Sequence, residues 1–175
     1  QVEKSSVIIG LADADLLSRK TRHPNLALLK IAGYLKDHGI AHPLIVDGDH
    51  VDLSQYKRIY VSKVFTFTEI PPFIERARAE LPSDVFSKKI RCGGTGWYAT
   101  ETDLSVFLEE RTKDMHALEN DPDLPGVNMR TQMPDYDLYV PFVESQIAAG
   151  AKRTYYKDYL DYSIGFLTRG CFRKC

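Results

Sequence analysis

Short apolar runs without regular polar alternation recur along the first half of the chain. They lie at residues 7–12, 44–46, 59–65 and 90–92 and are rich in Val, Ile and Leu. A strand of a parallel sheet is covered on both faces, and it therefore takes this pattern rather than strict alternation. We predict a strand at each of these positions.

Two segments between these runs carry apolar residues at helical spacing. Residues 24–39 begin with Pro-Asn, which is typical of a helix start, and end on Gly39, a residue common just past a helix. Residues 71–81 begin with a Pro-Pro pair. The residues predicted to face inward are Leu28, Ile31, Ala32 and Leu35 in the first helix and Phe73, Ile74, Ala77 and Leu81 in the second.

The alternation of strands and helices predicts an α/β fold with an open parallel sheet. In such a sheet, ligands bind in the crevice beyond the carboxyl ends of the strands. After Trp97 the pattern loosens, although residues 104–118 predict an amphipathic helix. Residues 133–150 predict a connecting arm with one short helix after Pro141, and residues 162–168 predict a new strand.

These elements suggest three parts of the chain. We expect an α/β domain over residues 1–125, a connecting arm over residues 126–161 and the start of a second domain over residues 162–175. Four tyrosines cluster near the end of the arm, and we interpret them as packing residues rather than as an aromatic ladder. They are Tyr155, Tyr156, Tyr159 and Tyr162.

The composition narrows the classes of function. The 175 residues are 43% hydrophobic and include 23 basic and 24 acidic side chains, for a formal net charge of -1. This balance argues against binding to duplex nucleic acid or to an anionic membrane. No apolar run approaches the roughly 20 residues of a membrane helix, and no secretory leader pattern appears. Three cysteines form no disulfide framework, so we expect a cytoplasmic protein.

Two of the cysteines, Cys171 and Cys175, lie within the last five residues. Two thiolates at this spacing reach one metal centre from a single loop, because iron and zinc both favour sulfur ligands. The spacing alone leaves three interpretations open. The pair is either a set of exposed thiols, a zinc or dithiol redox site, or part of a larger cluster site.

The letters around the pair favour the last interpretation. Tyr162-Ser-Ile-Gly-Phe-Leu-Thr-Arg-Gly-Cys171-Phe-Arg-Lys-Cys175 resembles the first strand and cluster loop of radical S-adenosylmethionine (radical SAM) enzymes, whose hallmark is Cys-x-x-x-Cys-x-x-Cys. The resemblance implies that Cys171 and Cys175 are two ligands of a 4Fe-4S cluster and that the third falls at position 178, three residues after Cys175. It also implies that the open iron chelates S-adenosylmethionine, which is cleaved reductively to a 5'-deoxyadenosyl radical.

The chain would then be the amino-terminal part of a larger Fe-S oxidoreductase that ends inside a truncated radical SAM barrel. We expect this fragment to be inactive by itself. The partners implied by the resemblance are a small-molecule cofactor, the protein's own C-terminal barrel domain and a substrate that the sequence does not identify.

The front domain resembles the flavodoxin-like, cobalamin-binding-type domains that precede the barrel in some of these enzymes. Those domains carry Asp-x-His-x-x-Gly after the first strand, then Ser-x-Leu, then Gly-Gly. At the same spacing this chain has residues 15–20, residues 62–64 and the pair Gly93-Gly94. The cofactor-binding residues that the resemblance implies are Asp15, Ser62, Gly93 and Gly94.

Two key positions of the first motif, Asp-x-His-x-x-Gly, carry other residues in this chain. Leu17 takes the place of the axial histidine, and Lys20 takes the place of the glycine. Because leucine has no lone pair for cobalt, cobalamin could bind only without that histidine. His23 is the nearest imidazole, and we assign it a loop or capping role. The alternative hypothesis is a vestigial α/β binding module that docks substrate or a partner protein and binds no cobalamin.

Two further groups are interpreted as structural. Asp47, Asp49, His50 and Asp52 follow a predicted strand but lack the final Glu of a calcium loop, so we interpret them as a solvated turn. Cys92 lies in a predicted strand and is interpreted as a buried thiol, while its place ahead of Gly93 leaves a ligand-facing role open.

Overall fold

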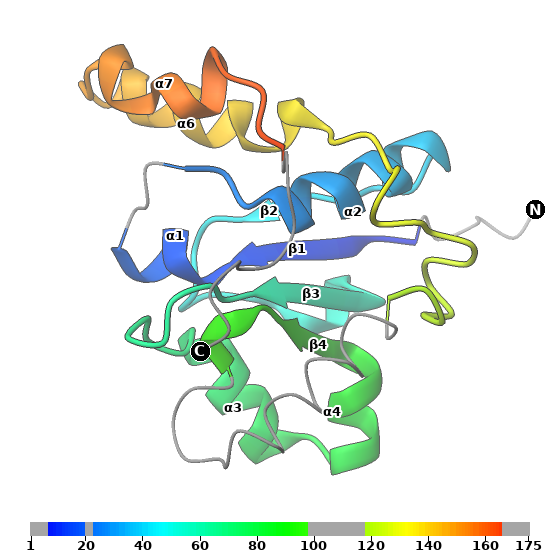
Figure 1. Ribbon diagram of the computed structural model, residues 1–175. Helices are drawn as coiled ribbons and strands as arrows, with labels where there is room; N and C mark the ends of the chain where they lie inside the picture. The colour runs from blue at the N-terminus through cyan, green and yellow to red at the C-terminus, as the bar shows by residue number, and fades with distance from the viewer. Residues whose placement is uncertain (1–6, 20–22, 98–117, 166–175) are drawn as a thin grey trace, which may run out of the picture.

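The computed structural model describes residues 7–19, 23–97 and 118–165. Within this part, the sheet consists of β1 (Ile9–Asp13), β2 (Leu44–Ile45), β3 (Arg58–Ser62) and β4 (Ile90–Gly93). All neighbouring strands are parallel, and their order is β2-β1-β3-β4 (Figure 1). The predicted α/β class with a parallel sheet is confirmed, and the strand order is compatible with a flavodoxin-like open sheet.

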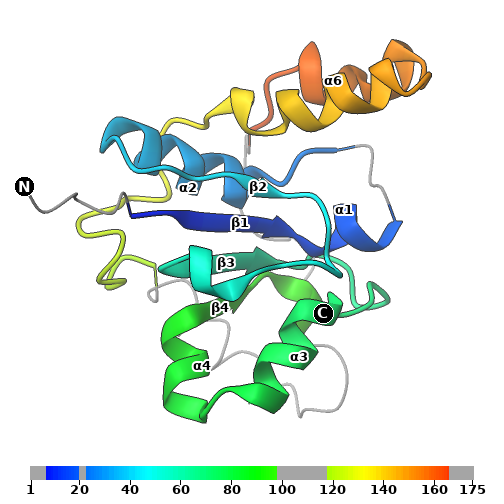
Figure 2. The same cartoon turned by 180° about the vertical axis from the view of Figure 1, so that it is seen from behind.

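Helices cover both faces of the sheet. α2 (Leu26–Asp37) packs on one face, and α3 (Pro72–Glu80) and α4 (Ser83–Lys89) pack on the other (Figures 1 and 2). Strand residues alternate between two hydrophobic clusters accordingly. Ile9, Leu11 and Tyr60 join the cluster under α2, whereas Ala12, Ile59 and Val61 join the cluster under α3. The apolar runs therefore reflect burial on both faces, as predicted.

The helix α2 has the predicted start, end and buried face. The Asn25 side-chain oxygen accepts a hydrogen bond from the Leu28 amide at 3.1 Å and caps the first turn. Gly39 has a φ of +66°, the left-handed conformation that often follows a helix. The predicted inward residues Leu28, Ile31, Ala32, Leu35, Phe73, Ile74 and Ala77 are all buried, and Leu81 is partly buried.

Two short helices and the end of β3 differ from the prediction. α1 (Ala14–Arg19) occupies a segment expected to be a loop, because the Asp13 carboxylate accepts the first amides of this helix. α4 lies directly before β4 and was not anticipated by the apolar pattern. β3 ends at Ser62, and residues 63–65, predicted as strand, belong to the loop that leads to α3.

The arm forms a further layer on the outer side of α2 (Figure 2). Its elements are η3 (Tyr136–Tyr139), α6 (Val140–Ala148), η4 (Arg153–Tyr156) and α7 (Lys157–Leu160). Pro141 stands in the first turn of α6, as predicted. The arm approaches α2 closely at Gly33, where a Cβ atom would lie 2.0 Å from the Met133 carbonyl oxygen. Any side chain at Gly33 would therefore push the arm away from α2.

The tyrosine cluster packs as predicted for two of its four members. Tyr156 and Tyr159 are buried with Tyr139 in the cluster under α2, which extends to the arm. The ring centroids of Tyr139 and Tyr159 lie 5.2 Å apart. Tyr155 and Tyr162 are exposed. The Tyr155 ring still lies edge-on against Tyr156, with 5.4 Å between ring centroids, so burial in the core is limited to the inner pair but ring packing is not.

The strand predicted at residues 162–168 is wrong for residues 162–165, which form no strand. The backbone of Ile164 instead hydrogen bonds with the Tyr136 hydroxyl, at 3.0 Å through its amide and 3.1 Å through its carbonyl oxygen. Residues 166–175, including Cys171 and Cys175, lie outside the described residues, as does nearly all of the helix predicted at 104–118.

Two short turns complete the described elements, η1 (Leu53–Gln55) before β3 and η2 (Thr95–Trp97) after β4. In the described ranges, no helix is both long enough and apolar enough to cross a membrane.

Candidate functional site at the carboxyl edge of the sheet

The strands β1 and β3 lie side by side, but the chain leaves them toward opposite faces of the sheet. α2 follows β1 on one face, and α3 follows β3 on the other. This arrangement defines the switch point at which ligands bind in open α/β sheets. Asp13 and Ser62 end the two strands and are direct partners in the strand register. The candidate site is built around this pair.

Asp13 is a buried carboxylate, only 1% exposed. Its Oδ1 accepts hydrogen bonds from the amides of Asp15 and Leu16, both at 3.1 Å, and its Oδ2 accepts one from the Tyr139 hydroxyl at 2.7 Å. Burial raises the pKa of Asp13 to about 6, although the Tyr139 and backbone hydrogen bonds act in the opposite direction. The pKa of this carboxyl group therefore lies well above that of an ordinary aspartate.

Tyr139 and Asn25 extend the hydrogen-bond network from Asp13 to Ser62. The Tyr139 hydroxyl donates to Asp13 and accepts the Asn25 amide at 3.1 Å, and the Asn25 side-chain nitrogen donates to Ser62 Oγ at 2.7 Å. Burial, followed by the charge of Asp13, raises the pKa of Tyr139 well above 10. The phenol therefore stays protonated and remains a donor. Ser62 and Asp13 are thus joined through a tyrosine of the arm.

Asp15 fixes the loop between β3 and α3. Its carboxylate accepts the Val64 amide at 2.8 Å, the Phe65 amide at 3.4 Å and the Thr68 hydroxyl. Asp15 is 3% exposed, so these donors surround it almost completely. Asp15 aligns with the first position of the cobalamin motif, and its carboxylate is therefore engaged by hydrogen bonds from the protein itself.

The glycines after β4 allow two loops to approach each other. Gly94 has a φ of +105°, and a Cβ atom there would lie 2.4 Å from the Lys63 carbonyl oxygen. Gly93 accepts hydrogen bonds through its carbonyl oxygen from the Lys63 amide and from the Trp97 indole, both at 3.0 Å. Gly96 donates its amide to the same Lys63 carbonyl at 2.9 Å. Backbone packing therefore accounts for this glycine-rich stretch.

The positions that depart from the cobalamin motif lie beside the network. Leu17 is partly buried against the cluster under α3 and near Gly48. Lys20 lies outside the described residues. His23 is in the loop before α2, and its exposed imidazole forms an ion pair with Asp158. Asn25, and not His23, caps α2.

Two other predicted groups have structural contacts. Asp47 accepts the Asp49 amide at 2.9 Å, and Asp52 caps η1 by accepting the Ser54 amide at 3.0 Å. Cys92 was expected to be buried. It is only partly buried, because β4 is an edge strand of the described sheet. Among the described residues, no group of three or more His, Cys, Asp or Glu side chains is arranged to hold a metal.

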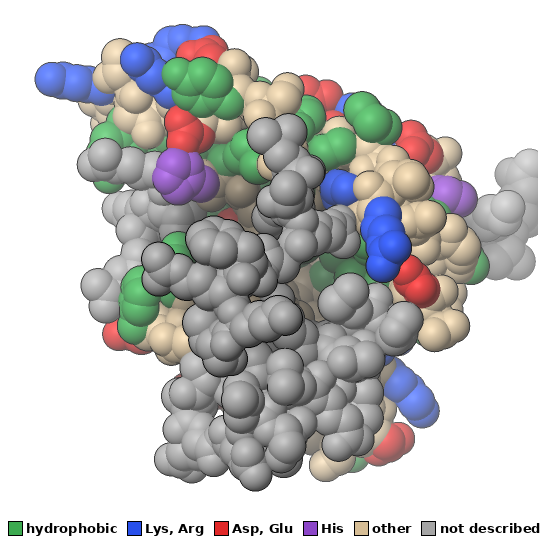
Figure 3. All heavy atoms as spheres, viewed as in Figure 1, with side chains coloured by type: hydrophobic (Ala, Val, Ile, Leu, Met, Phe, Trp, Pro, Cys, Tyr) green, Lys and Arg blue, Asp and Glu red, His purple; other side chains and the backbone are tan. Residues whose placement is uncertain are grey.

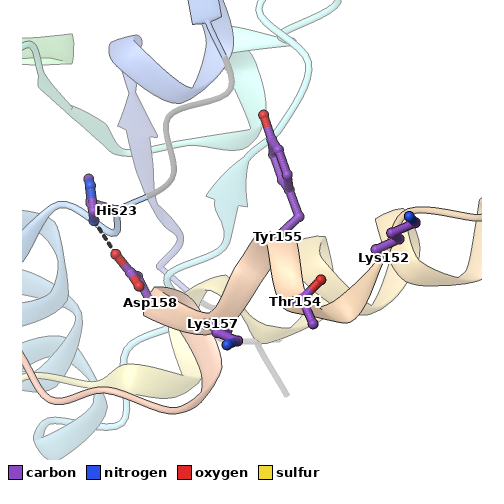
Figure 4. A pocket seen from close by; sticks show the side chains of 6 residues that line it. All are labelled: His23, Lys152, Thr154, Tyr155, Lys157 and Asp158. Carbon is purple, nitrogen blue, oxygen red and sulfur yellow. Dashed lines mark ion pairs between the residues drawn. The ribbon is translucent and has the colours of Figure 1, made fainter.

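A hollow of about 420 Å³ lies between the loop before α2 and the elements η4 and α7 (Figure 4). It is lined by His23, Lys152, Thr154, Tyr155, Lys157 and Asp158. Neither lysine has an ion pair within the described ranges, and Lys and Arg side chains gather at this end of the molecule (Figure 3). Ammonium and hydroxyl groups suit an oxyanion such as a phosphate.

Of the network, only Ser62 was selected from the sequence as a site residue, whereas Asp13, Tyr139 and Asn25 were not. Asp13 was detectable, since an acidic residue at the end of a buried strand stands at the edge where ligands bind. Tyr139 carried no signal, because 126 positions separate it from Asp13 and no local pattern connects them.

Comparisons with protein-family models, curated proteins and solved structures found no match to this chain. Function is therefore inferred from the residues and their contacts.

Proposed function

We propose that this chain is the amino-terminal part of a radical SAM iron–sulfur enzyme whose front domain carries no cobalamin. The letters of residues 162–175 motivate the first half of this proposal. In it, Cys171 and Cys175 supply the first two thiolates of a 4Fe-4S cluster, because such clusters are held by cysteine sulfur. The cluster supplies the electron for cleavage of S-adenosylmethionine in the full-length protein.

The fold supports the proposed domain arrangement. The parallel sheet is compatible with the flavodoxin-like order of cobalamin-binding-type domains. The arm packs on α2 and then leads the chain to Tyr162, where the resemblance to the barrel begins. A front domain in this position is suited to holding the arm and the catalytic part together.

One observation supports the absence of cobalamin. The residues that align with the cobalamin motif form their contacts with other parts of this chain. Both Asp15 oxygens accept hydrogen bonds from the loop between β3 and α3, and Ser62 accepts one from Asn25. Gly94 packs against the Lys63 backbone. The Asp15 carboxylate has both oxygens engaged within the protein, and Leu17 offers no ligand to cobalt, so these positions do not fit cobalamin as the family's motif requires. The geometry therefore favours the vestigial alternative within the same family.

The experiment for the radical SAM proposal uses the full reading frame. The codons after Cys175 should specify cysteine at position 178, three residues further on. The full-length protein, reconstituted anaerobically with iron and sulfide, should give the electron paramagnetic resonance signal of a reduced 4Fe-4S cluster. Cys171→Ala should abolish the signal, and Cys92→Ala, which changes the thiol on β4 that is not part of the matched motif, should leave it intact.

Two results would reject this half of the proposal. One is a stop codon or another residue at position 178, and the other is a cluster that survives Cys171→Ala. The chain that ends at Cys175 should hold no stable cluster, so strong charge-transfer absorption after its reconstitution would also contradict the proposal.

A second candidate function is the binding of a small phosphate-bearing ligand by the front domain and arm. The hollow beside α7 favours it, because Lys152 and Lys157 form no ion pair within the described residues and the Asp158 carboxylate that also lines the hollow is paired with His23 (Figure 4). Calorimetric titration with inorganic pyrophosphate at low ionic strength should show saturable binding. The double variant Lys152→Ala/Lys157→Ala should lose it, and Lys88→Ala, on exposed α4, should retain it. Absence of saturable binding in the unmodified protein would reject this candidate.

A further inference from the structure

The last described stretch of the chain is held by one hydroxyl group. The Tyr136 hydroxyl donates to the Ile164 carbonyl oxygen at 3.1 Å and accepts the Ile164 amide at 3.0 Å. Both polar groups of this residue's backbone are thus satisfied by a single side chain. Ile164 stands seven positions before Cys171. Tyr136 therefore fixes the backbone of Ile164, just after the arm.

Tyr136 begins a short rigid turn whose other end is anchored in the candidate site. η3 spans Tyr136–Tyr139, and Tyr139, 1% exposed, contacts Asp13 and Asn25 through its hydroxyl. The start of the turn is also fixed. The Asp135 side chain accepts the Asp137 amide at 3.2 Å, and the Asp135 amide donates to the Leu29 carbonyl oxygen of α2 at 2.8 Å.

The surroundings of Asp135 keep that anchor charged. Burial acts to raise the pKa of Asp135, but hydrogen bonds from Lys36, from the Asp137 amide and with His42 outweigh it and hold the pKa below its usual range. Lys36 lies on α2 and reaches Asp135 at 2.9 Å. The start of η3 is thereby bound to the helix that covers the sheet.

We infer that η3 is a clamp that positions Ile164 by reference to the carboxyl end of β1. Tyr139 and Asp13 are positioning residues in this device, and Tyr136 makes the contact with the positioned chain. A change at Asp13, such as a different protonation state or a bound ligand, would act on Ile164 through one turn of backbone. The clamp itself does not depend on the proposed function. Only its biological role does, which is to position the segment that leads to Cys171.

Amide hydrogen exchange tests the clamp in the 175-residue chain, followed by NMR at the Ile164 amide. Tyr136→Phe removes the direct partner and should reduce protection of this amide about fivefold or more, the equivalent of about 1 kcal/mol. Tyr139→Phe leaves Tyr136 in place but removes the anchor on Asp13. It should reduce protection of the same amide severalfold.

Tyr34→Phe is the matched control. The Tyr34 hydroxyl donates to the Pro125 carbonyl oxygen at 2.7 Å, so this variant also loses one hydrogen bond between α2 and the following chain, but away from η3. The Leu11 amide, bonded to the Pro43 carbonyl oxygen in the sheet, reports opening of the whole domain. Tyr34→Phe should leave the ratio of Ile164 to Leu11 protection unchanged, whereas Tyr139→Phe should lower it.

Equal ratios in Tyr139→Phe and Tyr34→Phe would overturn the inference. If Tyr139→Phe does not fold, Asp13→Asn keeps the shape of the anchor while removing its charge, and the same ratio decides the outcome. The test needs no iron. If the ratio of Ile164 to Leu11 protection falls but position 178 is not cysteine, the clamp stands and the radical SAM proposal is rejected. If the ratio is unchanged and position 178 is cysteine, the clamp is rejected and the radical SAM proposal stands.

Discussion

The two edges of the sheet both bury charged side chains, but they compensate those charges differently. At the amino edge, Arg58 forms ion pairs with Asp121 at 3.1 Å and with Asp123 at 2.7 Å, and Arg91 lies 3.7 Å from Asp121. At the carboxyl edge, Asp13 forms no ion pair in the described part of the chain. Its hydrogen-bond donors are backbone amides and a phenol.

This difference means that the charges at the amino edge are fixed by ion pairs, whereas the charge of Asp13 at the carboxyl edge depends on pH. Opposite charges at the amino edge stabilise one another and hold residues 121–123 on the sheet. No cation pairs with Asp13 in the described part of the chain, since the buried Lys63 at this edge donates to the Thr66 and Gly96 carbonyl oxygens, and burial raises the pKa of Asp13 to about 6. The edge at which open α/β sheets bind ligands is therefore also the edge that carries a carboxyl group with a raised pKa, about 6.

The amino edge can be broken by removing its central cation. Arg58→Met should lower the free energy of unfolding by about 3 to 5 kcal/mol, because it leaves the buried Asp121 and Asp123 without that partner. Lys57→Met is the control, since Lys57 is 57% exposed and its ion pair with Asp123 is screened by water, so the loss should stay below about 1 kcal/mol. Urea unfolding measures both. Similar losses in the two variants would show that burial does not distinguish these pairs.

The carboxyl edge should show its uncompensated charge as a pH dependence. The folded pKa of Asp13, about 6, lies above the ordinary value of 3.8, so the folded protein binds this proton more tightly than the unfolded chain does. Its contribution to stability is full below about pH 4, falls as the pH rises to about 6, and is then constant. The fall amounts to about 3 kcal/mol.

Asp13→Asn should remove this fall while other carboxylates titrate as before. The quantity to measure is the difference in unfolding free energy between variant and unmodified protein at pH 4, 5, 6 and 7. It should shift in favour of the variant as the pH rises. A difference that does not change with pH would contradict the raised pKa of Asp13.

A smaller effect is expected where the two loops of the carboxyl edge meet. Gly94→Ala should lower the free energy of unfolding by about 1 to 3 kcal/mol. The added Cβ atom would collide with the Lys63 carbonyl oxygen, and alanine is strained at this positive φ. Gly126→Ala is matched, with a φ of +75° but no atom within 4 Å of the added Cβ, and should cost about 1 kcal/mol. Thermal unfolding compares them. Equal costs would mean that the loops separate freely.

Much of the fold could be predicted from the apolar pattern, because burial on both faces leaves a strong local signal. Residues 24–39 show this well, since the cap, the inward residues and the final glycine all agree on one helix. α1 was missed because it depends on Asp13 as a cap, and its six residues carry little periodicity. The strand predicted from residue 162 was wrong over its described part because Tyr136, distant in sequence, takes the backbone groups of Ile164.

The edge of the sheet at which the candidate site lies follows from the predicted strand positions. Asp15, Ser62 and the Gly93-Gly94 pair were selected from the resemblance to cobalamin-binding-type domains. The sequence did not predict their contacts, because Asn25, Thr68 and Lys63 come from other elements and meet these residues only in the folded chain. A motif at the right spacing therefore does not tell whether its residues contact a cofactor or each other.

The most direct test of this account is a titration of the protein with hydroxocobalamin, followed by the visible spectrum and by co-elution on gel filtration. It should include Leu17→His, which restores the imidazole at the axial position. If internal contacts fill the carboxyl edge, neither protein should show a saturable spectral change or co-elute with the cofactor. Saturable binding by the unmodified protein, or binding gained by Leu17→His alone, would contradict the account.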